Sequence, residues 1–162
     1  MEPIDYVDKI DKAYQSQGYP PYRWSVNEEA PLTPLAKPLA DCTVSMLTSG
    51  GISYTEAEPF NPIAKDDFRL DEIDPGYDEN GFQIHDAYYD YRDGEKDINV
   101  IFPIVRLREL AADGVIGRVA ERLWSGFMGR IYKRTHTLEE AAPRFADELQ
   151  RDGVDAIVMV PA

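Results

Sequence analysis

The chain has 162 residues, of which 43% are hydrophobic, and this size and composition suit one domain with a single buried core. Its 30 acidic and 17 basic residues give a formal net charge of -13. Because this charge repels phosphate backbones and anionic lipid headgroups, we expect no nucleic acid and no membrane surface among its partners.

No stretch of the sequence holds the ~18 apolar residues that a membrane-spanning helix needs, and the acidic start lacks the basic and apolar regions of a signal peptide. We therefore expect a cytoplasmic protein. Cys42 is the only cysteine, and with His85 and His136 as the only histidines the chain cannot assemble a Cys/His zinc cluster. Acidic residues are too common to indicate a site for a hard cation, so no metal and no cofactor is predicted.

The sequence predicts an N-terminal helix and a proline-rich arm over residues 1–40, followed by an α/β domain over residues 41–162. The apolar residues of the helix recur at helical spacing: Ile4, Val7, Ile10 and Tyr14. Prolines punctuate the stretch after Gly18, which favours an extended surface arm. Aromatic residues among these prolines could bind a partner, whereas a tether that covers the core is the plainer interpretation.

Residues 43–48 are predicted to form the first strand of the core, and Ser49, Gly50 and Gly51 follow at its carboxyl end, here called the glycine loop. Open α/β sheets bind ligands at this end of their strands. Paired glycines let backbone N–H groups approach a carboxylate or phosphate, and Ser49 adds a hydroxyl donor. The same residues also suit an ordinary turn, and they lack the glycine spacing of a nucleotide loop, so a nucleotide-binding enzyme is the least favoured hypothesis.

A histidine lies among phenols and carboxylates after the next predicted strand, residues 68–73. His85, close to Asp86 and Asp90, could act as a general base or hold a substrate carboxylate. The segment has no paired nucleophile, so a packed, hydrogen-bonded histidine is the alternative.

Residues 98–102 form a short apolar run, which predicts a buried strand. Pro103 ends this run and suits the first turn of a helix, for which Gly114 is the expected stop. A strand that passes directly into a helix is the building unit of a doubly wound α/β sheet.

The last third of the chain combines several weaker patterns. Residues 116–123 suit a short helix or turn, and residues 124–129 suit a loop close to a ligand or a tightly packed part of the core. A capping-box pattern at residues 137–140 starts a helix that must kink or begin near Pro143. Residues 155–160 predict a buried parallel strand, after which the expected covering helix is missing.

Several of these segments together resemble one family, the selenoprotein B family of the glycine, sarcosine and betaine reductases, which also includes a subunit of D-proline reductase. The resemblance extends from about Trp24 to the C-terminus, whereas residues 1–23 have no evident counterpart. The segments that carry it are Thr48-Ser49-Gly50-Gly51, His85 with its neighbours, residues 97–103, residues 106–110, Phe127-Met128-Gly129 and residues 152–161.

The resemblance implies reductive cleavage of a carbon–nitrogen bond in an amino acid or N-methylated amine. In that family a selenocysteine or cysteine attacks the carbon that loses its amine, and this nucleophile must already be ionised at neutral pH. It follows a strand such as residues 155–160, and the chain stops at Ala162, one residue short of that position. Cys42 is no substitute, because it lies at the opposite end of the first strand and suits a small buried apolar position.

Two explanations stay open for this ending. A selenocysteine codon read as a stop would leave a truncated product, whereas a complete chain would use the pocket for binding or assembly. In either case we expect these residues not to perform the family's reaction alone. The rival hypothesis is therefore a non-catalytic subunit that joins a second copy, or a larger reductase subunit, through its N-terminal arm.

The predicted fold is a three-layer αβα sandwich with a mainly parallel, Rossmann-like sheet that is incomplete at its C-terminal end. The predicted ligand is a small amino-acid-like substrate, His85 is the predicted catalytic residue, and Asp97 is expected to fix a local turn. The residues predicted to bind substrate are Ser49, Gly50, Gly51, Asn99, Phe127, Met128 and Gly129.

Overall fold

The computed structural model describes residues 6–21, 28–29 and 33–161 of the chain. It divides into two units, Met1–Pro34 and Leu35–Ala162. The first unit contains helix α1 (Tyr6–Ser16), none of whose residues is buried. This confirms the predicted N-terminal helix, although Ile4 and most of the aromatic residues of the predicted arm lie outside the described residues.

The second unit is built on a five-stranded sheet with strand β1 (Thr43–Thr48) in its interior. On one edge β1 pairs in parallel with β7 (Ala156–Val160). On its other edge β1 pairs in parallel with β5 (Arg118–Val119) and then with β6 (Leu123–Gly126). Strand β3 (Leu70–Ile73) is antiparallel to β6, so the sheet is mixed but mostly parallel.

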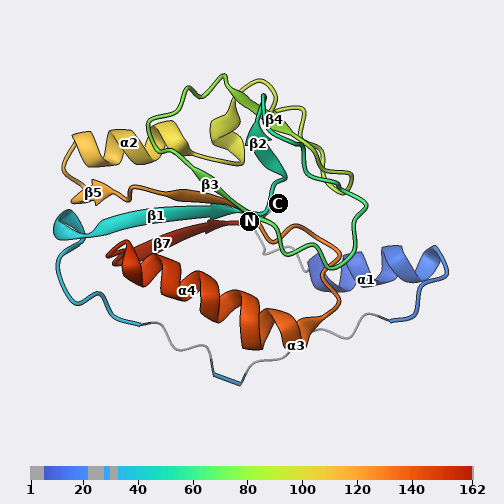
Figure 1. Ribbon diagram of the computed structural model, residues 1–162. Helices are drawn as coiled ribbons and strands as arrows, with labels where there is room; N and C mark the ends of the chain where they lie inside the picture. The colour runs from blue at the N-terminus through green and yellow to red at the C-terminus, as the bar shows by residue number, and fades with distance from the viewer. Residues whose placement is uncertain (1–5, 22–27, 30–32, 162) are drawn as a thin grey trace, which may run out of the picture. The chain divides into compact units, whose positions relative to one another are not determined.

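Helices cover both faces of this sheet, which confirms the predicted α/β sandwich (Figure 1). Helix α2 (Ile104–Ala112) lies on one face, and α4 (Ala142–Arg151) lies on the other. A second, two-stranded antiparallel sheet of β2 (Ile52–Tyr54) and β4 (Phe82–Ile84), here called the small sheet, lies on the α2 side. The unit therefore has the three layers that the sequence predicts.

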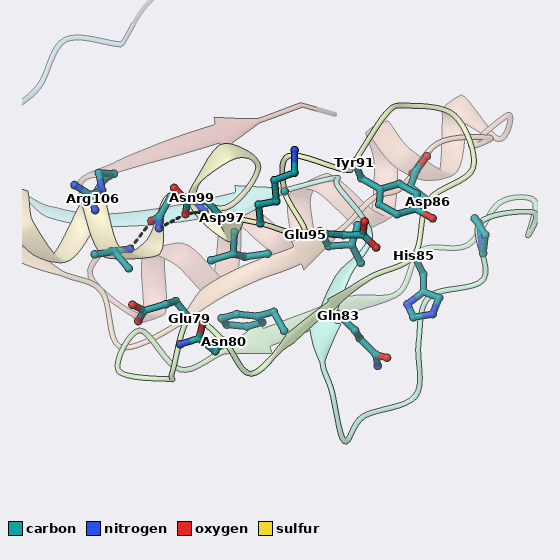
Figure 2. Close-up of a pocket in the computed structure, with 17 residues that line it drawn as sticks. Glu79, Asn80, Gln83, His85, Asp86, Tyr91, Glu95, Asp97, Asn99 and Arg106 are labelled. Carbon is teal, nitrogen blue, oxygen red and sulfur yellow. Dashed lines mark hydrogen bonds between the residues drawn. The ribbon is translucent and has the colours of Figure 1, made fainter.

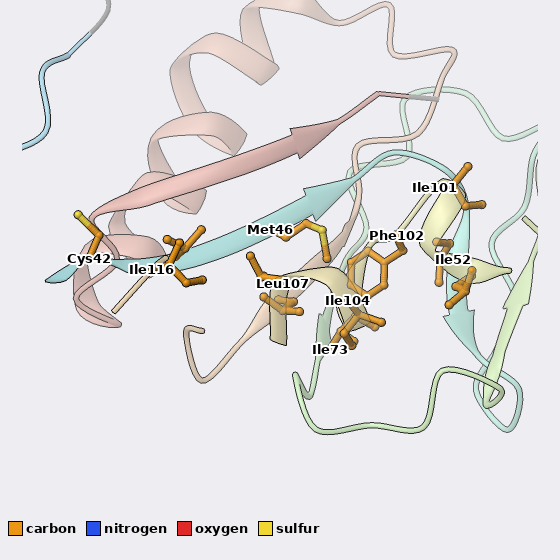
Figure 3. Close-up of a cluster of buried hydrophobic side chains, with 12 residues drawn as sticks. Cys42, Met46, Ile52, Ile73, Ile101, Phe102, Ile104, Leu107 and Ile116 are labelled. Carbon is orange, nitrogen blue, oxygen red and sulfur yellow. The ribbon is translucent and has the colours of Figure 1, made fainter. Parts of the chain in front are cut away.

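The main apolar core fills the space between the sheet and α2 (Figure 3). Cys42 is fully buried in it, as predicted for a small apolar side chain. The buried side chains of this core come from β1, β2, β3, β6, α2 and the turns beside them: Cys42, Val44, Met46, Ile52, Ile73, Ile98, Ile101, Phe102, Ile104, Leu107, Ile116 and Leu123.

The strand predicted at residues 98–102 is wrong. Ile98–Val100 is a short 3-10 helix, and the Phe102 N–H donates to the Ile98 carbonyl at 2.8 Å. Asp97 causes this turn, because its carboxylate accepts from the Asn99 N–H at 3.0 Å and offers the backbone an alternative to a sheet ladder. The role predicted for Asp97 is thus confirmed, and we call residues 97–103 the buried turn.

Helix α2 follows the buried turn as predicted. The Asn99 side-chain oxygen (Oδ1) accepts a hydrogen bond from the Val105 N–H at 2.9 Å. This bond satisfies one of the free N–H donors of the first helical turn. Gly114 follows the helix with φ of 70°, a conformation that favours glycine. The predicted helix stop is therefore confirmed.

Residues 123–126 form a buried strand, which confirms the alternative of tight core packing for residues 124–126 and leaves the predicted loop to residues 127–129. The small residues allow this strand to approach β3 closely. A Cβ at Gly126 would lie 2.4 Å from the Arg69 carbonyl oxygen, a distance that no side chain tolerates. Before this strand, Arg118 and Val119 form the short strand β5, and residues 116–123 contain no helix.

The helical region near the C-terminus has three parts, namely α3 (Arg134–His136), a π-helical turn (Thr137–Ala141) and α4. Thr137 lies inside this continuous helix and caps nothing with its side chain, so the predicted capping box is wrong. Pro143 lies near the start of α4, directly after the π-helical turn, where the regular ladder of hydrogen bonds is already interrupted and the missing N–H is tolerated. The prediction of a helix that begins or kinks near Pro143 is confirmed.

Strand β7 is parallel to β1, as predicted, but it is not buried. Val158 is 41% exposed and Met159 is 64% exposed. Among the described residues β7 pairs with β1 alone, so it forms an edge of the sheet. A continuous apolar run does not distinguish an interior strand from an edge strand.

Arg122 links three segments near the start of β6. Its guanidinium pairs with Asp152 and Glu148 at the end of α4 and with Glu72 of β3, at 2.7, 2.9 and 2.7 Å. It also lies over the Trp124 ring, 4.7 Å from the ring centre. Hydrogen bonding to Arg122 lowers the pKa of the Glu148 carboxyl below its ordinary value of 4.5.

We expect the Arg122→Met variant to be less stable than the wild type at about pH 7, with a difference that shrinks below about pH 4.5. A carboxyl with a lowered pKa stabilises the folded state above its unfolded pKa, and this contribution is lost as the pH falls through the lowered value. Urea unfolding of both proteins at several pH values measures the difference. Arg106→Met, which removes an exposed ion pair with Glu109, is the control and should differ little from the wild type.

Candidate functional site

Two of the predicted site segments, the glycine loop and residues 127–129, follow the neighbouring strands β1 and β6. The connections after these two strands run to opposite faces of the sheet. From β1 the chain passes through the glycine loop to the small sheet and α2 on one face. From β6 it passes through residues 127–129 to α3 and α4 on the other face (Figure 1). Such a switch point opens a crevice beyond the carboxyl ends of the strands, where open α/β sheets bind ligands. The topology therefore directs attention to the glycine loop.

The glycine loop is held firmly at its start. The Ser49 N–H donates to the Val160 carbonyl at 3.2 Å, which joins the loop to the carboxyl end of β7. The Gly50 N–H donates to the Thr48 hydroxyl at 3.1 Å, and that hydroxyl donates to the Ile101 carbonyl at 2.9 Å. Two of the N–H groups expected to face an anion are thus used within the protein.

Gly51 must be glycine, and it brings His85 and Met128 to the loop. Its φ is 67°, and the His85 N–H donates to its carbonyl at 2.9 Å. A Cβ at this position would lie 2.3 Å from the His85 carbonyl oxygen and 3.0 Å from the Met128 methyl carbon. The structure therefore brings together the glycine loop, His85 and Met128.

Tyr89 also belongs to this group, although the sequence did not single it out. Its hydroxyl donates to the Gly50 carbonyl at 2.7 Å, and burial raises its pKa to about 12. Several tyrosines crowd residues 85–91, and nothing in their order shows which one reaches a loop far away in the sequence. The cluster of phenols in this segment is the only sequence feature that indicates such a contact.

A polar cavity of about 980 Å³, here called the large cavity, lies between β4 and the buried turn (Figure 2). His85 lies in its wall, and the His85 Nδ1 atom is buried with no hydrogen-bond partner among the described residues. Buried polar atoms normally have a hydrogen-bond partner, so this unpaired ring nitrogen in a cavity wall needs an explanation, such as a water or a ligand that binds it. The charged and polar side chains around the cavity include Glu79, Asp86, Tyr91, Glu95, Asp97 and Arg106.

Asn99 also lines the large cavity, well away from His85 (Figure 2). Its amide nitrogen donates to the Asp97 carboxylate at 2.8 Å, and its oxygen caps α2. These bonds hold the buried turn and the helix start in place. The side chain thus has a structural role at a position where the sequence predicted substrate contact.

The Phe127 side chain lies apart from the glycine loop and the residues that contact it. Its ring packs against Phe145, with ring centres 5.9 Å apart, and it lines a second cavity of about 300 Å³ on the α4 side with Trp124. Its φ is 51°, an uncommon conformation for a bulky residue and one often found near functional sites. Gly129 is exposed, with open space around its Cα.

The described residues contain no group of three His, Cys, Asp or Glu side chains that could hold a metal ion. In the same part of the chain, no helix combines the length and apolar character that a bilayer crossing requires.

We expect Gly51→Ala to lower the free energy of unfolding by several kcal/mol, because it adds the clash with His85 to a φ penalty of about 1 kcal/mol. Gly153→Ala is the matched control, since Gly153 has φ of 65° and open space where a Cβ would lie. Urea unfolding compares the two variants. Equal losses would show that the close approach of His85 to the loop is not tight.

Comparison with known proteins gives a consistent result. The family model described as glycine/sarcosine/betaine reductase selenoprotein B matches residues 7–162. The chain is 33% identical over 154 residues to a protein of Acetoanaerobium sticklandii named D-proline reductase subunit gamma, covering 93% of this chain and 59% of the relative. The expectation that residues 1–23 have no counterpart is wrong for residues 7–23, because the family match begins at residue 7. No solved structure matches the chain.

Proposed function

The chain belongs to the glycine/sarcosine/betaine reductase selenoprotein B family, and we propose that it binds a small amino-acid-like substrate for reductive carbon–nitrogen bond cleavage at the carboxyl ends of β1 and β7. The chain spans 59% of the length of its D-proline reductase relative. The substrate would lie beside the glycine loop and His85.

One observation carries this proposal, namely that β1 and β7 end side by side. Thr48 pairs with Val160, and the Ser49 N–H binds the Val160 carbonyl. In the family that the sequence resembles, the chalcogen nucleophile follows a strand such as β7. A nucleophile at that place would lie beside the glycine loop, which is also hydrogen-bonded to the His85 backbone.

Cleavage of a carbon–nitrogen bond explains why a nucleophile would need the glycine loop and His85 near it. An amine is a poor leaving group, so the nucleophile must be ionised at neutral pH, and the departing nitrogen must gain a proton. His85, with its unpartnered Nδ1, is placed to hold this proton or to orient the substrate. The substrate carboxylate would accept a hydrogen bond from the glycine loop.

A second function is supported by α1. Tyr6, Ile10 and Tyr14 are 62%, 42% and 52% exposed, which leaves an apolar helix surface without cover. The relative from Acetoanaerobium sticklandii is named as a subunit. An assembly subunit that joins a second copy or a larger reductase subunit through α1 is the alternative.

We expect isothermal titration calorimetry to detect saturable binding of at least one of four probes: glycine, sarcosine, betaine and D-proline. His85→Gln should weaken that binding about fivefold, because one lost hydrogen bond costs about 1 kcal/mol. His136→Gln, which changes the histidine of the second cavity, should bind as the wild type does. Failure of all four probes to bind would overturn the proposed substrate class.

The alternative predicts self-association through α1. We expect the triple variant Tyr6→Ser, Ile10→Ser and Tyr14→Ser to sediment as a smaller species than the wild type in analytical ultracentrifugation, because exposed apolar side chains mark interaction surfaces. Lys12→Ser, on the same helix, should leave the sedimentation unchanged. Identical sedimentation of all three proteins would remove the support for assembly of like copies through this helix.

A further inference from the structure

The glycine loop offers fewer donors than its sequence suggests. Ser49 and Gly50 use their N–H groups in bonds to Val160 and Thr48. The Gly51 N–H has no acceptor among the residues that the structure describes, although Gly51 is buried. A buried N–H group without a partner is costly, so a ligand that accepts from it is bound more tightly.

Tyr89 determines where this N–H points. Its hydroxyl holds the Gly50 carbonyl at 2.7 Å, and that carbonyl belongs to the same peptide group as the Gly51 N–H. The described residues contain no cis peptide bond, so the carbonyl and the N–H of this planar group point in opposite directions. The Gly51 N–H is therefore directed away from Tyr89.

The bond from Tyr89 matters because the peptide that it holds lies between two glycines. Glycine turns freely about its backbone bonds, so a Gly-Gly peptide can rotate at little steric cost. The Tyr89 ring is half-buried and packs edge-on against Tyr91, which limits its own movement. Burial also raises the pKa of its hydroxyl to about 12, so it remains a donor at neutral pH.

We propose that Tyr89 is a positioning residue of this site, which fixes the Gly50–Gly51 peptide so that the Gly51 N–H donates to the carboxylate of the ligand. The proposal rests on the proposed function for the identity of the ligand. It assigns one backbone donor, rather than a cradle of several, to the recognition of the carboxylate. It also explains how residues 85–91 take part in the site through two bonds to the loop, from the His85 N–H and the Tyr89 hydroxyl.

The test compares the wild-type chain with Tyr89→Phe and with the control Tyr88→Phe. Tyr88 is the neighbouring tyrosine, and its side chain is 62% exposed. Binding of D-proline is measured by calorimetry, and the amide signal of Gly51 is followed by NMR. Acetate is a second probe, because it carries a carboxylate and no amine.

We expect Tyr89→Phe to keep the folded spectrum, to lose affinity for D-proline about tenfold and to lose the ligand-induced shift of the Gly51 amide. Tyr88→Phe should bind within about twofold of the wild type. Unchanged affinity and an unchanged Gly51 shift in Tyr89→Phe would overturn the proposal. Loss of the folded spectrum would also overturn it, because the hydrogen bond would then serve the fold.

Acetate separates this proposal from the proposed function. If D-proline and the other amino acids do not bind, but acetate shifts the Gly51 amide in the wild type and not in Tyr89→Phe, the substrate class is wrong and the positioning role stands. If no probe shifts the Gly51 amide of the wild type, Gly51 is not a carboxylate donor and the positioning role fails, whereas the proposed function fails only if calorimetry also detects no binding of the four amino-acid probes.

Discussion

The candidate site depends on one buried hydroxyl, that of Thr48. It donates to the Ile101 carbonyl and accepts from the Gly50 N–H, and the side chain is fully buried. Both partners belong to irregular backbone, where no sheet ladder satisfies them. A buried polar group needs its hydrogen bonds, so this hydroxyl holds the end of β1, the glycine loop and the buried turn in one arrangement.

The same principle operates throughout the α2 side of the molecule, where side chains bind irregular backbone. Asp97 forms the buried turn, Asn99 caps α2, and Tyr89 holds the glycine loop. At the other end of the sheet the Asp155 carboxylate accepts from the Thr43 N–H at 2.7 Å and pairs with Lys37. Strands β1 and β7 are thus pinned at both ends, which keeps the carboxyl end of β7 beside the glycine loop.

Much of the regular structure could be predicted because its signals are local. The strands at residues 43–48 and 155–160 and the helix that ends before Gly114 follow from apolar periodicity and from glycine in a left-handed conformation. The predictions failed where an apolar run, which indicates burial, was taken to indicate a β-strand. Ile98, Ile101 and Phe102 are buried as the pattern indicates, but in a turn, because hydrophobicity reports that a residue is inside and not what its backbone does.

By itself the sequence determined the α/β class, the family and the place of the glycine loop at the end of the first strand, because each depends on the order of residues along the chain. Only the tertiary structure decided that Tyr89 reaches Gly50 and that His85 and Met128 meet Gly51. It also decided that two of the three loop N–H groups are already used. These contacts join residues far apart in the sequence, and a hydrogen bond depends on distances that the order of residues does not specify.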